Sequence, residues 1–203
     1  MATAAATIQE EMECSLRGYG ATTQFALVAY VPEPLGSFLT NLRTELVPAC
    51  RLQSHVTLLT PRPLANPTWA LIDELRRATS DLGSFEVELG SLEVFPVTNV
   101  IYVSIARGRE EIIAMHDRLA RDMFAYKEPY PFHPHITLAQ EIPEDAVTDV
   151  FTRACARWEA WPHSRTFRVE ELIFVRNVNM QGWEDLSTHR LLPFSPNGSR
   201  PSA

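Results

Sequence analysis

Two short segments of the chain each carry a histidine and a threonine two residues apart. They are His55-Val-Thr57 and His135-Ile-Thr137, and a leucine follows each threonine. Imidazole titrates near neutrality, so one histidine can take a proton from an attacking oxygen while the other gives a proton to a leaving oxygen. Threonine hydroxyls can donate hydrogen bonds to the non-bridging oxygens of a phosphate. The four residues predict phosphodiester cleavage by acid–base catalysis, with no metal ion and no organic cofactor.

This chemistry requires both segments to be β-strands. Residues i and i+2 of a strand point to the same face, so each histidine would share a face with its threonine. Val56 and Leu58, and likewise Ile136 and Leu138, would point the other way and pack inward. Each segment is therefore predicted to be a strand with a His–Thr pair on one face and two buried apolar residues on the other.

Apolar periodicity places each motif strand third in a series of five elements that occurs twice. The first series has strands near 24–31, 54–60 and 85–95, with helices near 35–46 and 67–82. The second has strands near 100–105, 135–138 and 166–175, with helices near 110–124 and 144–158. Residues 183–192 are expected to add one more strand after it. The series predict an α/β fold of the α+β type, made of two half-domains. Each half would be an antiparallel or mixed sheet with helices outside, and a central cleft would separate the two lobes.

The domain boundaries follow from this repeat. We expect one bilobal domain over residues 22–192, with pseudo-twofold repeats near 22–95 and 98–176. The N-terminal segment 1–21 and the Pro/Ser/Gly-rich tail 193–203 are expected to be flexible.

Composition narrows the choice of substrate. The formal net charge is −7 and the pI is about 5.4, which argues against the broad basic face that long duplex nucleic acid requires. No segment has the apolar length of a membrane helix, and the cysteine spacing matches no zinc or redox motif. These features predict a cytoplasmic monomer that acts on a small nucleotide or an RNA end, away from membranes.

The paired His-x-Thr-Leu motifs resemble those of the 2H phosphoesterase superfamily, in particular the bacterial 2′-5′ RNA ligase-like and cyclic phosphodiesterase proteins. The resemblance covers roughly residues 22–192. It implies a bilobal fold with His55 and His135 as catalytic residues, and with Thr57 and Thr137 as phosphate-binding residues, in the central cleft. It also implies hydrolysis of 2′,3′-cyclic phosphates, or cleavage or joining of 2′-5′ linkages. Such relatives often carry a basic residue after the second motif, where this chain has Gln140-Glu141. This departure favours a smaller nucleotide, or an unknown phosphodiester, over an RNA substrate.

Five further residues are candidates for substrate contacts. Tyr130 and Phe132 precede the second motif and could either stack on a base or pack within their loop. His133 could line the entrance to the cleft. Arg62 follows the first motif and Arg176 ends a predicted strand, so either could meet a phosphate.

Two other functions remain open at this level. One is a non-catalytic module that binds nucleotides or RNA ends. The other is a metal-dependent hydrolase that uses His55, His133 and His135 as ligands. The sequence names neither the natural substrate nor the direction of the reaction, and it does not say which histidine is the acid.

Overall fold

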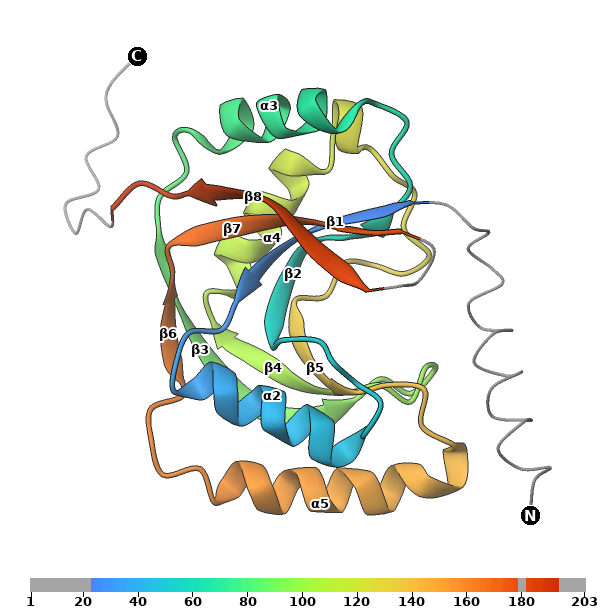
Figure 1. Ribbon diagram of the computed structural model, residues 1–203. Helices are drawn as coiled ribbons and strands as arrows, with labels where there is room; N and C mark the ends of the chain where they lie inside the picture. The colour runs from blue at the N-terminus through green and yellow to red at the C-terminus, as the bar shows by residue number, and fades with distance from the viewer. Residues whose placement is uncertain (1–22, 179–181, 194–203) are drawn as a thin grey trace.

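The computed structural model describes residues 23–178 and 182–193, and within them the chain forms two four-stranded antiparallel sheets and four α-helices (Figure 1). The first sheet has the strand order β2-β1-β7-β8. Its strands are β1 (Gln24–Tyr30), β2 (His55–Arg62), β7 (Glu171–Asn177) and β8 (Trp183–Arg190). The second sheet has the order β5-β4-β3-β6. Its strands are β3 (Phe85–Val94), β4 (Ile101–Arg107), β5 (His135–Ala139) and β6 (Thr166–Val169). The expected α+β fold class, with two lobes, is confirmed.

The helices form where the sequence carries apolar residues at helical spacing. They are α2 (Leu35–Leu46), α3 (Thr68–Thr79), α4 (Arg109–Leu119) and α5 (Val147–Glu159). In α2 the buried side chains include Leu35, Leu39, Leu42 and Leu46, which form one stripe. The short 3₁₀ turns η1 (Asp122–Phe124) and η2 (Glu144–Ala146) lie next to α4 and α5 in the sequence.

The helices cover the outer faces of the two sheets, and they cross between lobes. Helix α2 follows β1 of the first sheet but packs beside α5 and against β5 of the second sheet (Figure 1). Helices α3 and α4 lie on the other side, in contact with β8 and β2. One continuous apolar core joins side chains from both sheets, among them Leu27, Val56 and Ile136. The two lobes are therefore packed as one unit.

The sequence repeats do not coincide with the two sheets. Strand β3, the last element of the first repeat, pairs with β4 of the second. In return β7 pairs with β1. The predicted strand over 166–175 is in fact two strands, because Glu170 separates β6 in one sheet from β7 in the other. Periodicity reports which face of a strand is buried, but it carries no information about which strand lies alongside.

The segments expected to be flexible, 1–21 and 193–203, lie outside the described residues, apart from residue 193. Among the helices of the described ranges, none combines the length and the apolar character needed to cross a bilayer.

Candidate active site

The two motif strands hold equivalent positions in the fold. Strands β2 and β5 are edge strands of their respective sheets, and they lie against each other (Figure 1). Their first five residues have the same alternation of half-buried and buried side chains. Val56, Leu58, Ile136 and Leu138 are at most 1% exposed, as the sequence predicted. Each histidine and its threonine share the opposite, partly accessible face, which we call the histidine face of that sheet.

The two imidazoles are held in the same way. Nδ1 of His55 lies 2.7 Å from the carbonyl oxygen of Gln53, and Nδ1 of His135 lies 2.7 Å from that of His133. A carbonyl oxygen can only accept, so each Nδ1 carries the proton. Each Nε2 is then left unprotonated, and nothing in the described parts of the chain hydrogen-bonds to it. Both rings therefore present a free Nε2 that can accept a proton.

The electrostatic surroundings favour the neutral form of both histidines. Burial lowers the pKa of His55 from 6.5 to about 4, with the charges of Arg43 and His135 acting in the same direction and the hydrogen bond to Gln53 opposing them. Burial also lowers the pKa of His135, helped by the charges of His133 and Arg43. Because the charge of one motif histidine acts on the other, the two imidazoles share one electrostatic environment.

The motif threonines are available for a ligand. Thr57 and Thr137 are both partly exposed beside their histidines. Over residues 23–178 and 182–193, neither hydroxyl takes part in a hydrogen bond. A hydroxyl without a protein partner can turn its proton toward a phosphate oxygen. The arrangement thus offers two proton-accepting nitrogens and two hydroxyl donors.

The histidine face of the first sheet is mainly apolar. It carries a small cluster made of Ala26, Val28, Ile173 and Val175. Tyr30 and Trp183 pack against this cluster, and the Tyr30 ring meets the His55 ring edge-on at 6.5 Å between centroids. The Tyr30 hydroxyl donates to Asp185 Oδ1 at 2.7 Å, which together with burial raises the pKa of Tyr30. This face suits an uncharged part of a substrate, such as a base or a sugar ring.

The histidine face of the second sheet is more polar. The rings of Phe95 and Tyr102 stack at 4.1 Å, and both meet His135 edge-on, at 5.1 and 5.3 Å. The Tyr102 hydroxyl donates to Glu93 Oε2 at 2.8 Å. Burial and this contact raise the pKa of Tyr102 to about 12, and the same hydrogen bond lowers the pKa of Glu93. Sequence reasoning missed these three residues. Glu93 and Tyr102 lie on the face of β3 and β4 that Thr137 shares, and Phe95 directly follows β3.

Arg43 is a further residue that sequence reasoning missed. It lies on the buried face of α2, is 2% exposed, and donates from Nη1 to the carbonyl oxygen of Thr137 at 2.6 Å. A charged residue within the apolar stripe of a helix was the signal that could have found it, since arginine is rarely fully buried without a partner.

Arg62 is buried and ion-paired, so it is not placed to contact a phosphate. Its side chain is 1% exposed and forms a 2.6 Å ion pair with Glu128. It also donates to the carbonyl oxygens of Thr60 and Phe124, at 2.8 and 2.7 Å. The guanidinium is therefore committed to holding β2 against the loop that leads to β5, and this role is structural.

Two other sequence candidates make their contacts within the protein. Val175 lies on the histidine face of the first sheet, so its neighbour Arg176 points to the opposite face of β7. Arg176 pairs there with Glu184, and its side chain is directed away from the site. Phe132 stacks on His116 with 3.7 Å between centroids and an interplanar angle of 5°. This stacking occupies one face of the Phe132 ring and favours packing within the protein over stacking on a base.

His133 and Tyr130 keep their candidate roles as predictions. The ring of His133 meets Phe95 edge-on at 5.3 Å, and its carbonyl orients His135. Tyr130 is 57% exposed on the same loop. Within the ranges that the structure describes, no three His, Cys, Asp or Glu side chains converge on a point that could hold a metal ion.

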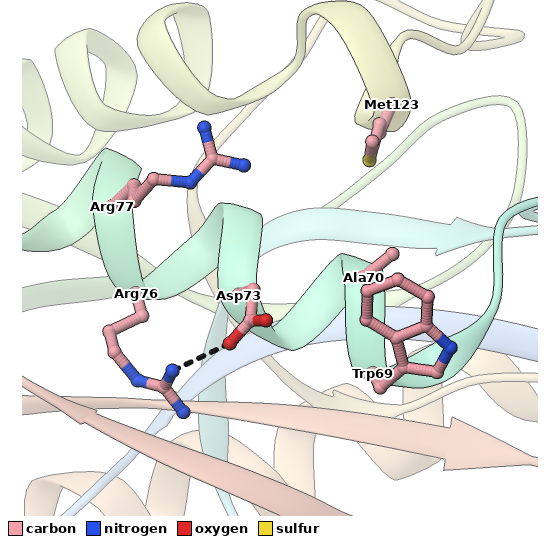
Figure 2. Close-up of a pocket in the computed structure, with 6 residues that line it drawn as sticks. All are labelled: Trp69, Ala70, Asp73, Arg76, Arg77 and Met123. Atoms are coloured by element: carbon pink, nitrogen blue, oxygen red, sulfur yellow. Dashed lines mark hydrogen bonds and ion pairs between the residues drawn. The ribbon is translucent and has the colours of Figure 1, made fainter.

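One surface hollow of the described chain lies elsewhere, on α3 and η1 (Figure 2). It is lined by Trp69, Ala70, Asp73, Arg76, Arg77 and Met123. The two arginines pair with acids of their own helix, Asp73 and Glu74. None of the four motif residues lines the hollow, so it has no part in the proposed chemistry.

Comparison with known proteins adds a family match. The family model described as the 2'-5' RNA ligase superfamily matches residues 31–180. Among curated proteins, one from Oceanobacillus iheyensis is 30% identical over 83 residues, which are 40% of this chain and 48% of that protein. One from Bacillus pumilus is 29% identical over 130 residues, 63% of this chain and 75% of that protein. Both carry the name "Putative phosphoesterase". The chain thus spans about half the length of the first relative and three quarters of the second.

Solved structures agree on the fold. The crystal structure of E. coli LigT complexed with 3′-AMP has a TM-score of 0.58 and 17% sequence identity, and it covers 83% of this chain and 98% of that chain. LigT complexed with phosphate gives a TM-score of 0.57 at 16% identity, with coverage of 85% and 99%. At such identities the likeness concerns the fold alone.

Proposed function

The chain belongs to the 2′-5′ RNA ligase superfamily, and on that premise we propose that it is a phosphodiesterase acting on 2′,3′-cyclic phosphates or 2′-5′ linkages. One observation carries the proposal. His55 and His135 are held by matching hydrogen bonds to main-chain carbonyl oxygens, which leaves two free Nε2 atoms in one electrostatic environment. A packing role would not explain why this arrangement occurs twice, each time with a threonine on the same face.

The proposed reaction uses the four motif residues directly. The Nε2 of one histidine takes a proton from water as its oxygen attacks the phosphorus atom. The other histidine, protonated in the complex, gives a proton to the ribose oxygen that leaves, and the bond from phosphorus to that oxygen breaks. Thr57 and Thr137 donate hydrogen bonds to the non-bridging oxygens as negative charge builds on them. Joining a 2′-5′ linkage would be the same step with a 5′-hydroxyl in place of water, and cleavage of that linkage to a cyclic phosphate would be the reverse of the joining step.

We further propose that the substrate is a small nucleotide or an RNA end. The net charge of −7 supports this, as do the ion pairs that occupy Arg62 and Arg176. The apolar face with Tyr30 and Trp183 can accept a nucleoside. LigT has been solved with 3′-AMP, a nucleotide of this size. A cytoplasmic location and a monomeric state stay predictions from the sequence.

The test is hydrolysis of 2′,3′-cyclic nucleotides by the purified full chain in excess EDTA. We expect turnover that chelator does not reduce and that disappears in both His55→Ala and His135→Ala. Turnover that EDTA abolishes and added metal restores would replace the two-histidine mechanism by a metal-dependent one. Binding of a nucleotide without turnover of cyclic phosphates or 2′-5′ linkages would contradict the assignment as an enzyme.

A further inference from the structure

The guanidinium of Arg43 lies at the junction of the two lobes. Helix α2 contributes this side chain, and its Nη1 donates to the Thr137 carbonyl oxygen of β5. Strand β5 is an edge strand, so a carbonyl on its outer side has no neighbouring strand to donate to it. The Nη2 atom lies 3.5 Å from the Cys50 sulfur. Arg43 therefore ties the backbone of the second motif to a helix that begins in the other half of the sequence.

The charge on Arg43 has no counter-ion in the described residues 23–178 and 182–193. The residue is 2% exposed, its Nε has no hydrogen-bond partner, and no carboxylate pairs with it. A buried charge without an opposite charge is costly. Arg62 gives the contrast within the same protein, since it is equally buried but has Glu128 as its partner. An anion bound close to the histidines would supply the negative charge that Arg43 lacks.

The charge of Arg43 acts on both motif histidines. Other charged and titratable groups also surround them. They are Tyr30 with Asp185 beside His55, Tyr102 with Glu93 beside His135, and His133 with Arg109 beyond it. The two carboxylates accept hydrogen bonds from the tyrosines, and within the described residues neither forms an ion pair with Arg43. Among the groups named, Arg43 alone acts on both histidines with a permanent positive charge.

We propose that Arg43 is a positioning residue of the site, which fixes the Thr137 strand through its hydrogen bond and attracts the phosphodiester anion between the two histidines through its uncompensated charge. The identification of this anion as a phosphodiester rests on the proposed function. Because Arg43 is buried, it acts on the substrate through the field it creates and through the backbone it holds, without touching the substrate.

The test compares Arg43→Lys, which keeps the charge, with Arg43→Gln and Arg43→Met, which remove it. Inorganic phosphate serves as the probe, and the imidazole NMR signals of His55 and His135 report both binding and titration. We expect phosphate affinity to fall about 10-fold in the Gln and Met variants and to change less than threefold in the Lys variant. Without the charge, both imidazoles should titrate higher by about half a pH unit or more.

Each alternative outcome bears on the proposal. If the Lys, Gln and Met variants lose phosphate affinity equally and the imidazole titrations do not move, Arg43 is a packing residue and the proposal fails. An uncompensated charge also predicts that Arg43→Met folds with an unchanged or higher melting temperature. Loss of folding in both neutral variants would therefore contradict the proposal as well.

These measurements need no turnover, so they separate the role of Arg43 from the proposed enzymatic activity. Where the wild type does hydrolyse cyclic nucleotides, kcat/KM should fall about 10-fold in Arg43→Gln, and its pH profile should move to higher pH. The pH profile of Arg43→Lys should stay in place. If the wild type does not hydrolyse cyclic nucleotides, the phosphate affinities and the imidazole titrations still test the role of Arg43.

Discussion

His55 and His135 make the same contact in two different strands, because each donates from Nδ1 to the carbonyl oxygen two residues earlier at 2.7 Å. This contact fixes the tautomer and the direction of each ring without using a carboxylate. The charge balance of the site therefore depends on more distant groups, which are Arg43 and His135 for His55, and His133 and Arg43 for His135.

Replacing either histidine should remove most of the activity. His55→Ala and His135→Ala should each lower kcat/KM on a 2′,3′-cyclic nucleotide by about 10²–10⁴-fold, because each loses one proton-transfer group. The double variant should lose little more than either single variant, since one transfer without the other does not complete the reaction. His163→Ala, at an exposed position, is the matched control. Turnover near the wild-type rate in either single variant would refute the mechanism.

Removing a threonine hydroxyl should cost less than removing a histidine. Thr57→Val and Thr137→Val keep the shape of the side chain and remove its donor to the phosphate. We expect a loss of about 10²-fold in kcat, with the melting temperature nearly unchanged because neither hydroxyl has a partner in the described protein. Steady-state kinetics with Thr152→Val, on the exposed side of α5, provide the comparison. A change in KM alone would indicate a binding role only.

The pH dependence of activity should reflect the lowered pKa of both histidines. In the free protein the pKa of His55 is about 4 and that of His135 is below its usual value, so the pH profile of kcat/KM should centre below pH 6.5. A bound phosphate anion favours imidazolium, so the profile of kcat should lie at higher pH. Rate measurements from pH 4 to 9 test this. A kcat/KM optimum above pH 7.5 would contradict the electrostatic description.

Protein stability should fall as the pH is lowered below about 6.5. The unfolded chain protonates His55 near 6.5, whereas the folded protein does so only near 4, so the unfolded state binds more protons between these values. This difference should reduce the free energy of unfolding by about 3 kcal/mol between pH 6.5 and 4. Urea unfolding at several pH values should show a smaller loss in His55→Asn than in the wild type. His163→Asn, at an exposed site, should behave as the wild type does.

Arg62 should matter for stability and not for substrate binding. Arg62→Met leaves the largely buried Glu128 without its partner, which should cost about 3–5 kcal/mol in the free energy of unfolding. Arg118→Met breaks an exposed pair with Asp81 and should cost about 0–1 kcal/mol. Chemical denaturation compares the two variants. An unchanged stability in Arg62→Met, together with a raised KM, would restore the phosphate-contact role that the structure argues against.

The sequence by itself determined the local features of this protein. Strand and helix positions, the shared face of each His-x-Thr pair and the inward packing of Val56 and Ile136 all follow from periods of two and 3.6 residues. Such periods involve only residues close together in the chain. They also revealed the repeat, and with it the resemblance to the correct superfamily.

Only the tertiary structure decided which distant segments meet. It paired β3 with β4 and β7 with β1, against the order of the repeats. It also gave three arginines different contact partners, which the sequence does not indicate. Arg62 meets Glu128, Arg176 meets Glu184, and Arg43 reaches the Thr137 backbone with no acid paired to it in the described part of the chain. The role of an arginine depends on its partner, and for Arg62 and Arg43 that partner comes from the other half of the chain.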